Sequence, residues 1–212
     1  MNIEVWSDFV CPFCYIGKRR LEEALKQFPH TAEVEVEYKS YELDPHSPKD
    51  IGKNMYELLA SKYGMSVVEA KKNCAAVGEQ ASSVGLTYHF DSMIPTNTFD
   101  AHRLVKFAKS KGKDAELTET LLHAYFTDAK HIGEYETLVD LAASVGMNKE
   151  EASAVLEDES SYAAEVREDI ARAQQIGVRG VPFFVINNKY AISGAQPLET
   201  FVGALNKAWE EQ

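Results

Sequence analysis

The apolar positions of the chain follow successive patterns, and each pattern predicts a different kind of element. Residues 2–7 alternate apolar with polar side chains and therefore predict a short strand. Residues 12–28 place apolar side chains at helical spacing, with Pro12 suited to a first turn and Pro29 ending the run. Residues 33–43 alternate again. The opening 44 residues are thus predicted to form one βαβ unit.

The long middle of the chain, residues 45–170, carries a helical period almost throughout. It contains three helix start signals, each a capping side chain three residues before an acidic one: Ser66 with Glu69, Asn97 with Asp100, and Asn148 with Glu151. No repeat of fixed period interrupts it. We therefore expect an almost wholly helical block.

The tail returns to mixed structure. Residues 181–187 predict a buried strand, residues 190–193 a partner strand after a turn, and Pro197 opens an amphipathic helix. A crossover needs only a dozen or so residues, so the helical block is too long to be one. The prediction is an α/β core of residues 1–44 and 171–212, interrupted by a helical subdomain of residues 45–170.

Charge and composition limit the partners. The 212 residues carry 22 Lys and Arg against 33 Asp and Glu, a net charge of −11 at pH 7. Such a surface repels nucleic-acid phosphates and anionic lipids, so neither nucleic acid nor membrane is expected as a partner. No apolar run approaches the roughly 18 residues of a bilayer span, and the N-terminus lacks a signal-peptide pattern. These features predict a cytoplasmic protein.

Candidate chemistry lies in the sequence C-P-F-C, where Cys11 and Cys14 meet the start of the first predicted helix. Unpaired N–H groups and the positive end of the helix dipole favour a thiolate on Cys11, while Cys14 lies one turn further in. This arrangement predicts that Cys11 attacks a disulfide and Cys14 resolves the product.

Two structural explanations of the same cysteines remain open. A C-x-x-C is half of a zinc site, although no second such pair accompanies it and His89, His102 and His123 are scattered. Two buried thiols packed as small apolar groups are the other explanation. The strand, turn and helix around the motif favour redox chemistry, with no metal and no bound cofactor.

Three segments carry a family resemblance: SDFVCPFCYIG, NTFDAHRLVKFAK from Asn97, and IGVRGVPFFVINNKYAISGAQPLETF from Ile176. Together they resemble the cytosolic FrnE-like branch of the DsbA family of thiol oxidoreductases, over nearly the whole chain. The resemblance implies a thioredoxin-like fold with a helical insertion. It makes Cys11 the nucleophile, Cys14 the resolving cysteine and Pro182 the cis-proline that faces them.

The resemblance also implies that Pro12, Phe13 and Val181 border the substrate, which would be a thiol or disulfide of a protein or a small molecule. From the residues alone, Val181-Pro182 opens a strand, and an ordinary trans proline at the strand start is the alternative to a cis one. At the position of Phe13, the families that this chain resembles have histidine or, more often in the FrnE-like branch, tryptophan. The phenylalanine ring donates no hydrogen bond to a thiolate. We therefore expect a weaker oxidant than DsbA.

Two rival functions stay open. The first rival is a glutathione-dependent isomerase or kappa-type transferase, since these proteins have a similar fold and insertion. They typically have serine in place of the first cysteine, and a serine-aspartate pair where this chain has Ala195 and Gln196. A thioredoxin-fold adaptor that uses its cysteines only as a redox sensor is the second rival.

Other residues carry weaker signals. Asp8 has three alternative interpretations: a proton acceptor near the thiol, a solvated turn residue, or a helix cap. Cys74 fits a small apolar role better than a redox one. His102 and Arg103 are possible site-lining groups, and the acidic run 157–159 reads as a solvated face.

Overall fold

A computed structural model describes residues 1–211 of the chain. By its internal contacts the chain divides into two compact units. One unit comprises residues 1–43 together with the chain from residue 168 onward, and the other comprises residues 44–167.

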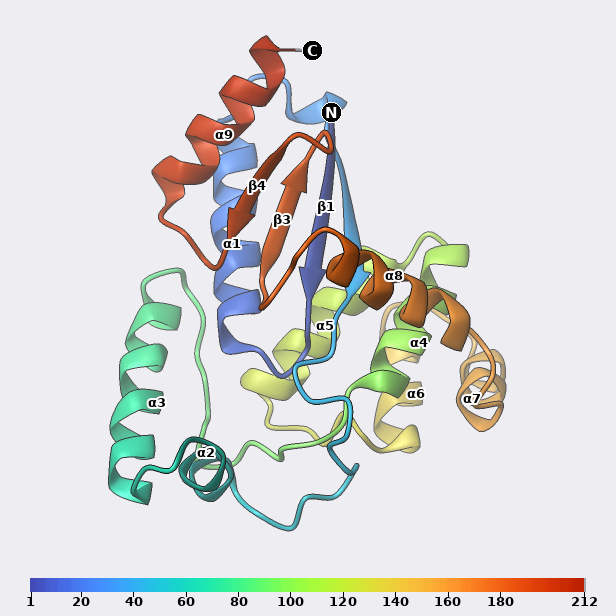
Figure 1. The fold of residues 1–212 in the computed structure, drawn as a ribbon. Helices are drawn as coiled ribbons and strands as arrows, with labels where there is room; N and C mark the ends of the chain where they lie inside the picture. Colours follow the sequence, from blue (N-terminus) through green and yellow to red (C-terminus); the bar gives the residue numbers. More distant parts are fainter. Residues whose placement is uncertain (212) are drawn as a thin grey trace. The chain divides into compact units, whose positions relative to one another are not determined.

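The first unit is built on one sheet (Figure 1). Its described strands are β1 (Asn2–Ser7), β2 (Glu35–Ser40), β3 (Phe183–Ile186) and β4 (Tyr190–Ser193), in the order β2-β1-β3-β4. β1 is parallel to β2 and antiparallel to β3, and β4 is antiparallel to β3. The predicted α/β fold class is confirmed, although the second and third strands are shorter than their sequence patterns suggest.

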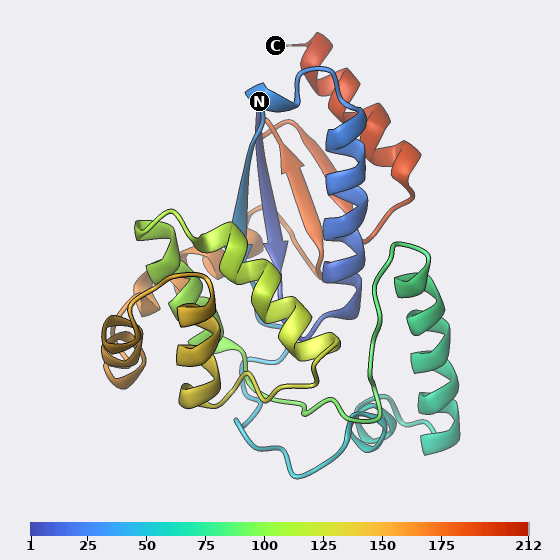
Figure 2. The same ribbon diagram turned by 180° about the vertical axis from the view of Figure 1, so that it is seen from behind.

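Alternation along β1 assigns its side chains to two faces of the sheet. Ile3 and Val5 join a core with α1 (Pro12–Gln27) and α9 (Leu198–Glu210), which lie side by side in Figure 2. Trp6 points to the opposite face and packs on Ala173 of α8 (Ala163–Gln175). Each face of the sheet is thereby covered by helix.

The second unit is helical, apart from its loops. Its helices are α2 (Met55–Tyr63), α3 (Val67–Ser82), α4 (Phe99–Ser110), α5 (Asp114–Phe126), α6 (Tyr135–Ser144) and α7 (Lys149–Glu157), followed by the first residues of α8. α4 packs against α5, α6 and α7, whereas α2 and α3 pack against each other. A 3-10 turn, η1 (Thr31–Glu33), belongs to the first unit.

The helix start signals succeed at two of three places. Ser66 and Glu69 form a capping box at α3, and the Asn148 side chain caps α7. The predicted box at Asn97 is wrong, because α4 begins after Thr98 and the Asn97 side chain accepts a hydrogen bond from the N–H of Phe99 (2.9 Å). Asn97 thus orders the turn before the helix.

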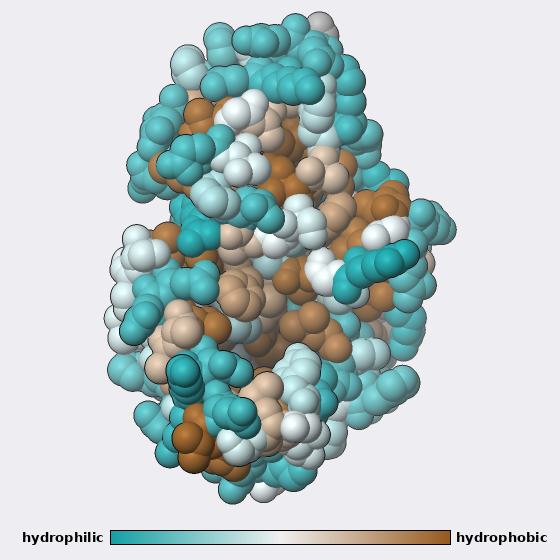
Figure 3. All heavy atoms as spheres, turned by 60° about the vertical axis from the view of Figure 1, so that its left-hand side comes forward, coloured by the Kyte–Doolittle hydropathy of each residue, from teal (hydrophilic) through white to brown (hydrophobic). Residues whose placement is uncertain are grey.

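A capping box that the sequence analysis did not identify opens α2, where Asn54 and Glu57 exchange hydrogen bonds. Two large side chains are exposed on either side of the turn between α2 and α3: Tyr63, the last residue of α2, is 63% exposed, and Val68 in the first turn of α3 is 76% exposed. The surface in Figure 3 mixes such apolar groups, in brown, with hydrophilic ones, in teal. Within residues 1–211, no helix has both the length and the apolar character needed to cross a membrane.

Candidate functional site

The two cysteines of the C-P-F-C sequence lie where β1 leads into α1. Cys11 is the N-cap residue of α1, in an extended conformation, and Pro12 occupies the first turn. The Cys11 N–H donates to the Asp8 carbonyl (3.2 Å), and the Cys14 N–H donates to the Cys11 carbonyl (3.0 Å). The Cys11 sulfur therefore stands at the positive end of the helix dipole, as the sequence predicted, and the first turn of α1 holds no acidic side chain.

Val181 meets Cys11 across the site. The Cys11 thiol donates a hydrogen bond to the Val181 carbonyl, with sulfur and oxygen 3.4 Å apart. The peptide bond between Val181 and Pro182 is cis. This contact follows from the sheet, because β3 pairs with β1 so that Phe183 stands opposite Trp6. Residues 170 positions apart are thus brought together by strand pairing.

Cys14 is buried one turn into the helix, and its surroundings set its ionisation. Burial is the main reason that the pKa of the Cys14 thiol is well above its usual value of 9.0. A hydrogen bond with Cys11 and the charge of Cys11 raise the pKa of Cys14 further. The Asp8 backbone N–H and the Ser7 hydroxyl act in the opposite direction through hydrogen bonds to Cys14. Both thiols are free in the structure.

Close packing between α1 and β3 holds the two sides of the site together. A Cβ on Gly17 of α1 would lie 2.9 Å from Cγ of Pro182 and 3.1 Å from Cζ of Phe184, both closer than normal packing allows. Only glycine at this helical position lets Pro182 approach the helix that carries the cysteines. Pro182 itself is buried.

The residues between the cysteines differ in exposure. Phe13 is 37% exposed, Pro12 is half-buried, and Val181 is half-buried across from them. Cys11 itself is only 4% exposed. Pro12, Phe13 and Val181 therefore share the first unit with the cysteines, and their predicted contact with substrate stays a prediction.

The structure corrects the interpretation of Asp8. The Asp8 residue is 1% exposed, so it is not a solvated turn residue, and the N-cap of α1 is Cys11 rather than Asp8. Its carboxylate accepts a hydrogen bond from the Leu43 N–H (2.8 Å). Asp8 thus joins the turn before Cys11 to the chain that follows β2.

Arg103, considered as a possible site-lining group, has a structural task in the second unit. Its fully buried guanidinium donates to the carbonyls of Val155, Leu156, Asp158 and Ser161 at 2.7–3.0 Å and pairs with Asp100. These carbonyls lie at the end of α7 and just beyond it, where helix carbonyls lack partners within the helix. Arg103 therefore caps α7.

The remaining candidates are also accounted for within the second unit. His102 is buried on α4, and Cys74 is buried on α3. Burial and the neighbouring Asp91 charge raise the pKa of the Cys74 thiol, which opposes formation of the reactive thiolate.

The acidic run 157–159 is exposed, and its Asp158 accepts hydrogen bonds from the hydroxyls of Ser160 and Ser161. No cluster among residues 1–211 has the ligands to hold a metal.

Two residues near the site were missed by the sequence analysis. Ser7 contacts Cys14, and only its place at the end of the strand before the cysteines hinted at a role. Arg20 of α1 donates to the carbonyls of Ala195 and Gln196, and so ties the loop after β4 to the helix that carries the cysteines. Both interactions form only when different elements of the first unit pack together.

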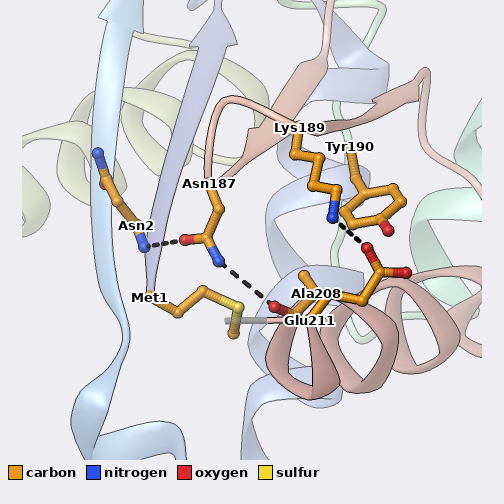
Figure 4. A pocket seen from close by; sticks show the side chains of 7 residues that line it. All are labelled: Met1, Asn2, Asn187, Lys189, Tyr190, Ala208 and Glu211. Atoms are coloured by element: carbon orange, nitrogen blue, oxygen red, sulfur yellow. Dashed lines mark hydrogen bonds and ion pairs between the residues drawn. The ribbon is translucent and has the colours of Figure 1, made fainter.

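A separate hollow of about 430 Å³ lies in the first unit, at the start of β1 rather than at its end (Figure 4). The polar groups drawn there bind one another: Asn187 accepts from the Asn2 N–H and donates to the Ala208 carbonyl, and Lys189 pairs with Glu211. Because these groups are mutually satisfied, nothing in the hollow points to a ligand.

Comparisons with known proteins agree with this geometry. The family model described as DSBA-like thioredoxin domain matches residues 2–206. A probable DsbA oxidoreductase of Streptomyces coelicolor superposes with a TM-score of 0.96 and 44% identity, covering 100% of this chain and 91% of its own. The cytosolic disulfide reductase DsbM of Pseudomonas aeruginosa, solved with GSH, shares the fold at a TM-score of 0.68 and 15% identity, with 99% of this chain and 100% of its own covered. The Bacillus subtilis protein YwbO is 28% identical over 97% of this chain and 96% of its own.

Proposed function

The chain belongs to the DSBA-like thioredoxin domain family, whose thioredoxin fold it shares, and from this premise we propose that it is a thiol-disulfide oxidoreductase acting through Cys11 and Cys14. One observation carries the proposal. The Cys11 thiol stands at the start of α1 and on the Val181 carbonyl, with the buried Cys14 thiol one turn further along the same helix. A pair of thiols in this arrangement can exchange with a disulfide in two steps.

In the proposed reaction the Cys11 thiolate attacks one sulfur of a substrate disulfide. A bond forms between Cys11 and that sulfur, and the other substrate sulfur leaves as a thiolate. Cys14 then attacks Cys11, so that the Cys11–Cys14 bond forms, the mixed disulfide breaks, and the Cys14 proton passes to the second departing sulfur. The substrate gains two electrons, which the dithiol loses.

Val181 and Pro182 are proposed to contact the substrate together with Pro12 and Phe13. The Val181 carbonyl lies on the Cys11 thiol, and the half-exposed Phe13 ring gives the same edge an apolar surface. Protein disulfides and small-molecule disulfides are both proposed as substrates. The finer family position, the FrnE-like branch, and a cytoplasmic location are further parts of the proposal, the latter supported by the description of DsbM as cytosolic.

Glutathione is the small-molecule thiol to examine first, because DsbM was solved with GSH. In this chain the loop at Ala195 and Gln196 is internally bonded: Arg20 holds both carbonyls, and the Gln196 side-chain amide donates to the Ser193 carbonyl (2.8 Å). Activity that requires glutathione and persists without Cys14 would favour the glutathione-dependent class over the dithiol mechanism.

Turnover of insulin disulfides with dithiothreitol tests the proposal. We expect the wild-type protein to accelerate insulin reduction, Cys11→Ser to abolish the acceleration, and Cys74→Ser to leave it unchanged because Cys74 is buried in the other unit. Cys14→Ser is expected to accumulate a mixed disulfide on Cys11, visible by mass spectrometry. Acceleration that survives in Cys11→Ser would refute Cys11 as the nucleophile.

A further inference from the structure

Arg179 lies two residues before Val181, whose carbonyl accepts the hydrogen bond from the Cys11 thiol. Consecutive Cα atoms are about 3.8 Å apart, so the Cα atom of Arg179 lies within about 8 Å of the Cα atom of Val181. The Arg179 residue is exposed. A positive charge therefore stands at the surface close to the proposed nucleophile.

The backbone that carries Arg179 is held by its neighbours. Val178 is buried in an apolar cluster with Trp6 and Ala173, and its N–H donates to the Ala173 carbonyl (2.9 Å). Val181 packs against the same cluster. The position of Arg179 beside the site is thus fixed by packing on both sides, while its own side chain takes no part in the core.

Among residues 1–211, Arg179 is the arginine whose side chain has no partner within the chain. The chain has 33 Asp and Glu against 22 Lys and Arg, so acidic partners are in excess. The structure nevertheless leaves the five N–H donors of this guanidinium open to a molecule from outside. The other arginines bind a carboxylate, backbone carbonyls or an aromatic ring: Arg19 with Glu22, Arg20 with Ala195 and Gln196, Arg103 with Asp100, Arg172 with Glu4, and Arg167 over Phe99.

We propose that Arg179 binds a carboxylate that the substrate carries close to its disulfide, and that it thereby selects acidic disulfides for attack by Cys11. The inference rests on the proposed function. A guanidinium meets a carboxylate with two parallel hydrogen bonds, which a lysine ammonium does not. The carboxylate belongs either to a small disulfide or to an acidic side chain next to a substrate cysteine, and the chemistry of recognition is the same.

The expected effect is a change of preference among disulfides. The net charge of −11 repels acidic substrates at long range, whereas Arg179 acts at contact. At about 0.1 M salt the screening length is about 10 Å, so a comparison at this salt concentration reports mainly the charges beside the site. Exposed pairs of opposite charge contribute little in water, and the loss of one corresponds to a rate change of about threefold.

The experiment compares three small disulfides with the reduced protein in a Cys74→Ser background at pH 7 and about 0.1 M salt. Dithiodipropionate is a dianion, hydroxyethyl disulfide is neutral and cystamine is a dication. Acid quenching, labelling of the remaining thiols with N-ethylmaleimide and mass spectrometry give the rate with each probe. In Arg179→Gln we expect the ratio of the dithiodipropionate rate to the hydroxyethyl disulfide rate to fall about threefold, and the corresponding ratio for cystamine to rise.

Two further variants separate the contact from other effects of the substitution. Lys26→Gln removes the same charge from the last turn of α1, about 22 Å along the helix from Cys11, and should leave the ratios unchanged. Arg179→Lys keeps the charge without the paired hydrogen bonds, so its ratios should lie between those of the Arg179 protein and Arg179→Gln. Unchanged ratios in Arg179→Gln would overturn the proposal. An equal change in Lys26→Gln would also overturn it, because the net charge would then be the cause.

A pair of disulfide-linked peptides, with glutamate or with glutamine next to the cysteine, distinguishes the two sources of the carboxylate. If Arg179→Gln reduces the preference for the glutamate peptide about threefold, acidic proteins are among the substrates; if it alters only the small-disulfide ratio, the carboxylate is that of a small molecule. Failure of every probe to oxidise Cys11 in the Arg179 protein would instead refute the proposed dithiol function.

Discussion

Cys11 and Cys14 share one helix turn, yet their sulfur atoms have different surroundings. Cys11 faces the start of α1 and the Val181 carbonyl, whereas Cys14 is enclosed and holds its proton because burial raises its pKa well above 9.0. The sequence predicted this division from the helix start alone. The contacts that enforce it, from Ser7 and Val181, come from chain neighbours that only the folded sheet provides.

Alkylation of the reduced protein should display the difference. With iodoacetamide between pH 7 and pH 9 we expect Cys11 to be modified at least tenfold faster than Cys14, because only a thiolate reacts and Cys14 stays protonated over this range. Modification of Cys14 should rise only as the pH exceeds 9. Peptide mapping by mass spectrometry measures both rates, and Cys14→Ala confirms the assignment of the fast site. Equal rates at pH 8 would contradict the prediction.

At the scale of elements, the contact between α1 and β3 could not be predicted from local sequence patterns. Helical periodicity located α1, and alternation located β3, but neither pattern says which helix position faces which strand. Gly17 reads in the sequence as a weak point of a helix, since glycine disfavours helices by about 1 kcal/mol relative to alanine. In the folded protein it is the position at which Pro182 and Phe184 come too close for any side chain.

Gly17→Ala should therefore destabilise the protein despite the better helix former. We expect the free energy of unfolding to fall by about 1–3 kcal/mol, because the added methyl group must displace Pro182 or Phe184. The same shift should slow disulfide exchange, since Pro182 adjoins the Val181 carbonyl on Cys11. Urea unfolding and the insulin assay measure the two effects.

Gly203 in α9 supplies the control. Nothing lies within 4 Å of a Cβ placed there, so Gly203→Ala should gain up to about 1 kcal/mol from helix propensity and leave exchange unaffected. Similar stability changes in the two alanine variants would show that crowding at Gly17 has no energetic weight.

Considered as a whole, the molecule combines two compact units with a strong negative charge. The hydrophobic period of the sequence changes near residues 45 and 170, and the internal contacts of the structure divide the chain at 43/44 and 167/168. Sequence patterns misplaced the start of α4 because Asn97 caps a turn rather than the helix. The box at α2 has the same spacing as the other start signals, since Asn54 stands three residues before Glu57, so it could have been predicted from the sequence.

The net charge of −11 should bias the choice among small disulfides. Cystamine is a dication and oxidised glutathione an anion, so attraction favours the first and repulsion hinders the second at low ionic strength. Raising salt from about 0.01 M to about 0.1 M shortens the screening length from about 30 Å to about 10 Å. We expect the reduced protein to react more slowly with cystamine and faster with oxidised glutathione as salt increases. Stopped-flow rates that move in the same direction for both probes would refute this electrostatic selection.

Arg103 has a consequence for how the chain tolerates mutation. Its guanidinium binds the backbone carbonyls of Val155, Leu156, Asp158 and Ser161, and every residue type supplies that atom. The bonds to Arg103 therefore persist whichever side chains stand at 157–159, and this segment depends on one residue that is distant in the sequence. A mutational scan should find Glu159 permissive and Arg103 intolerant even of lysine, whose single ammonium cannot span the same four acceptors.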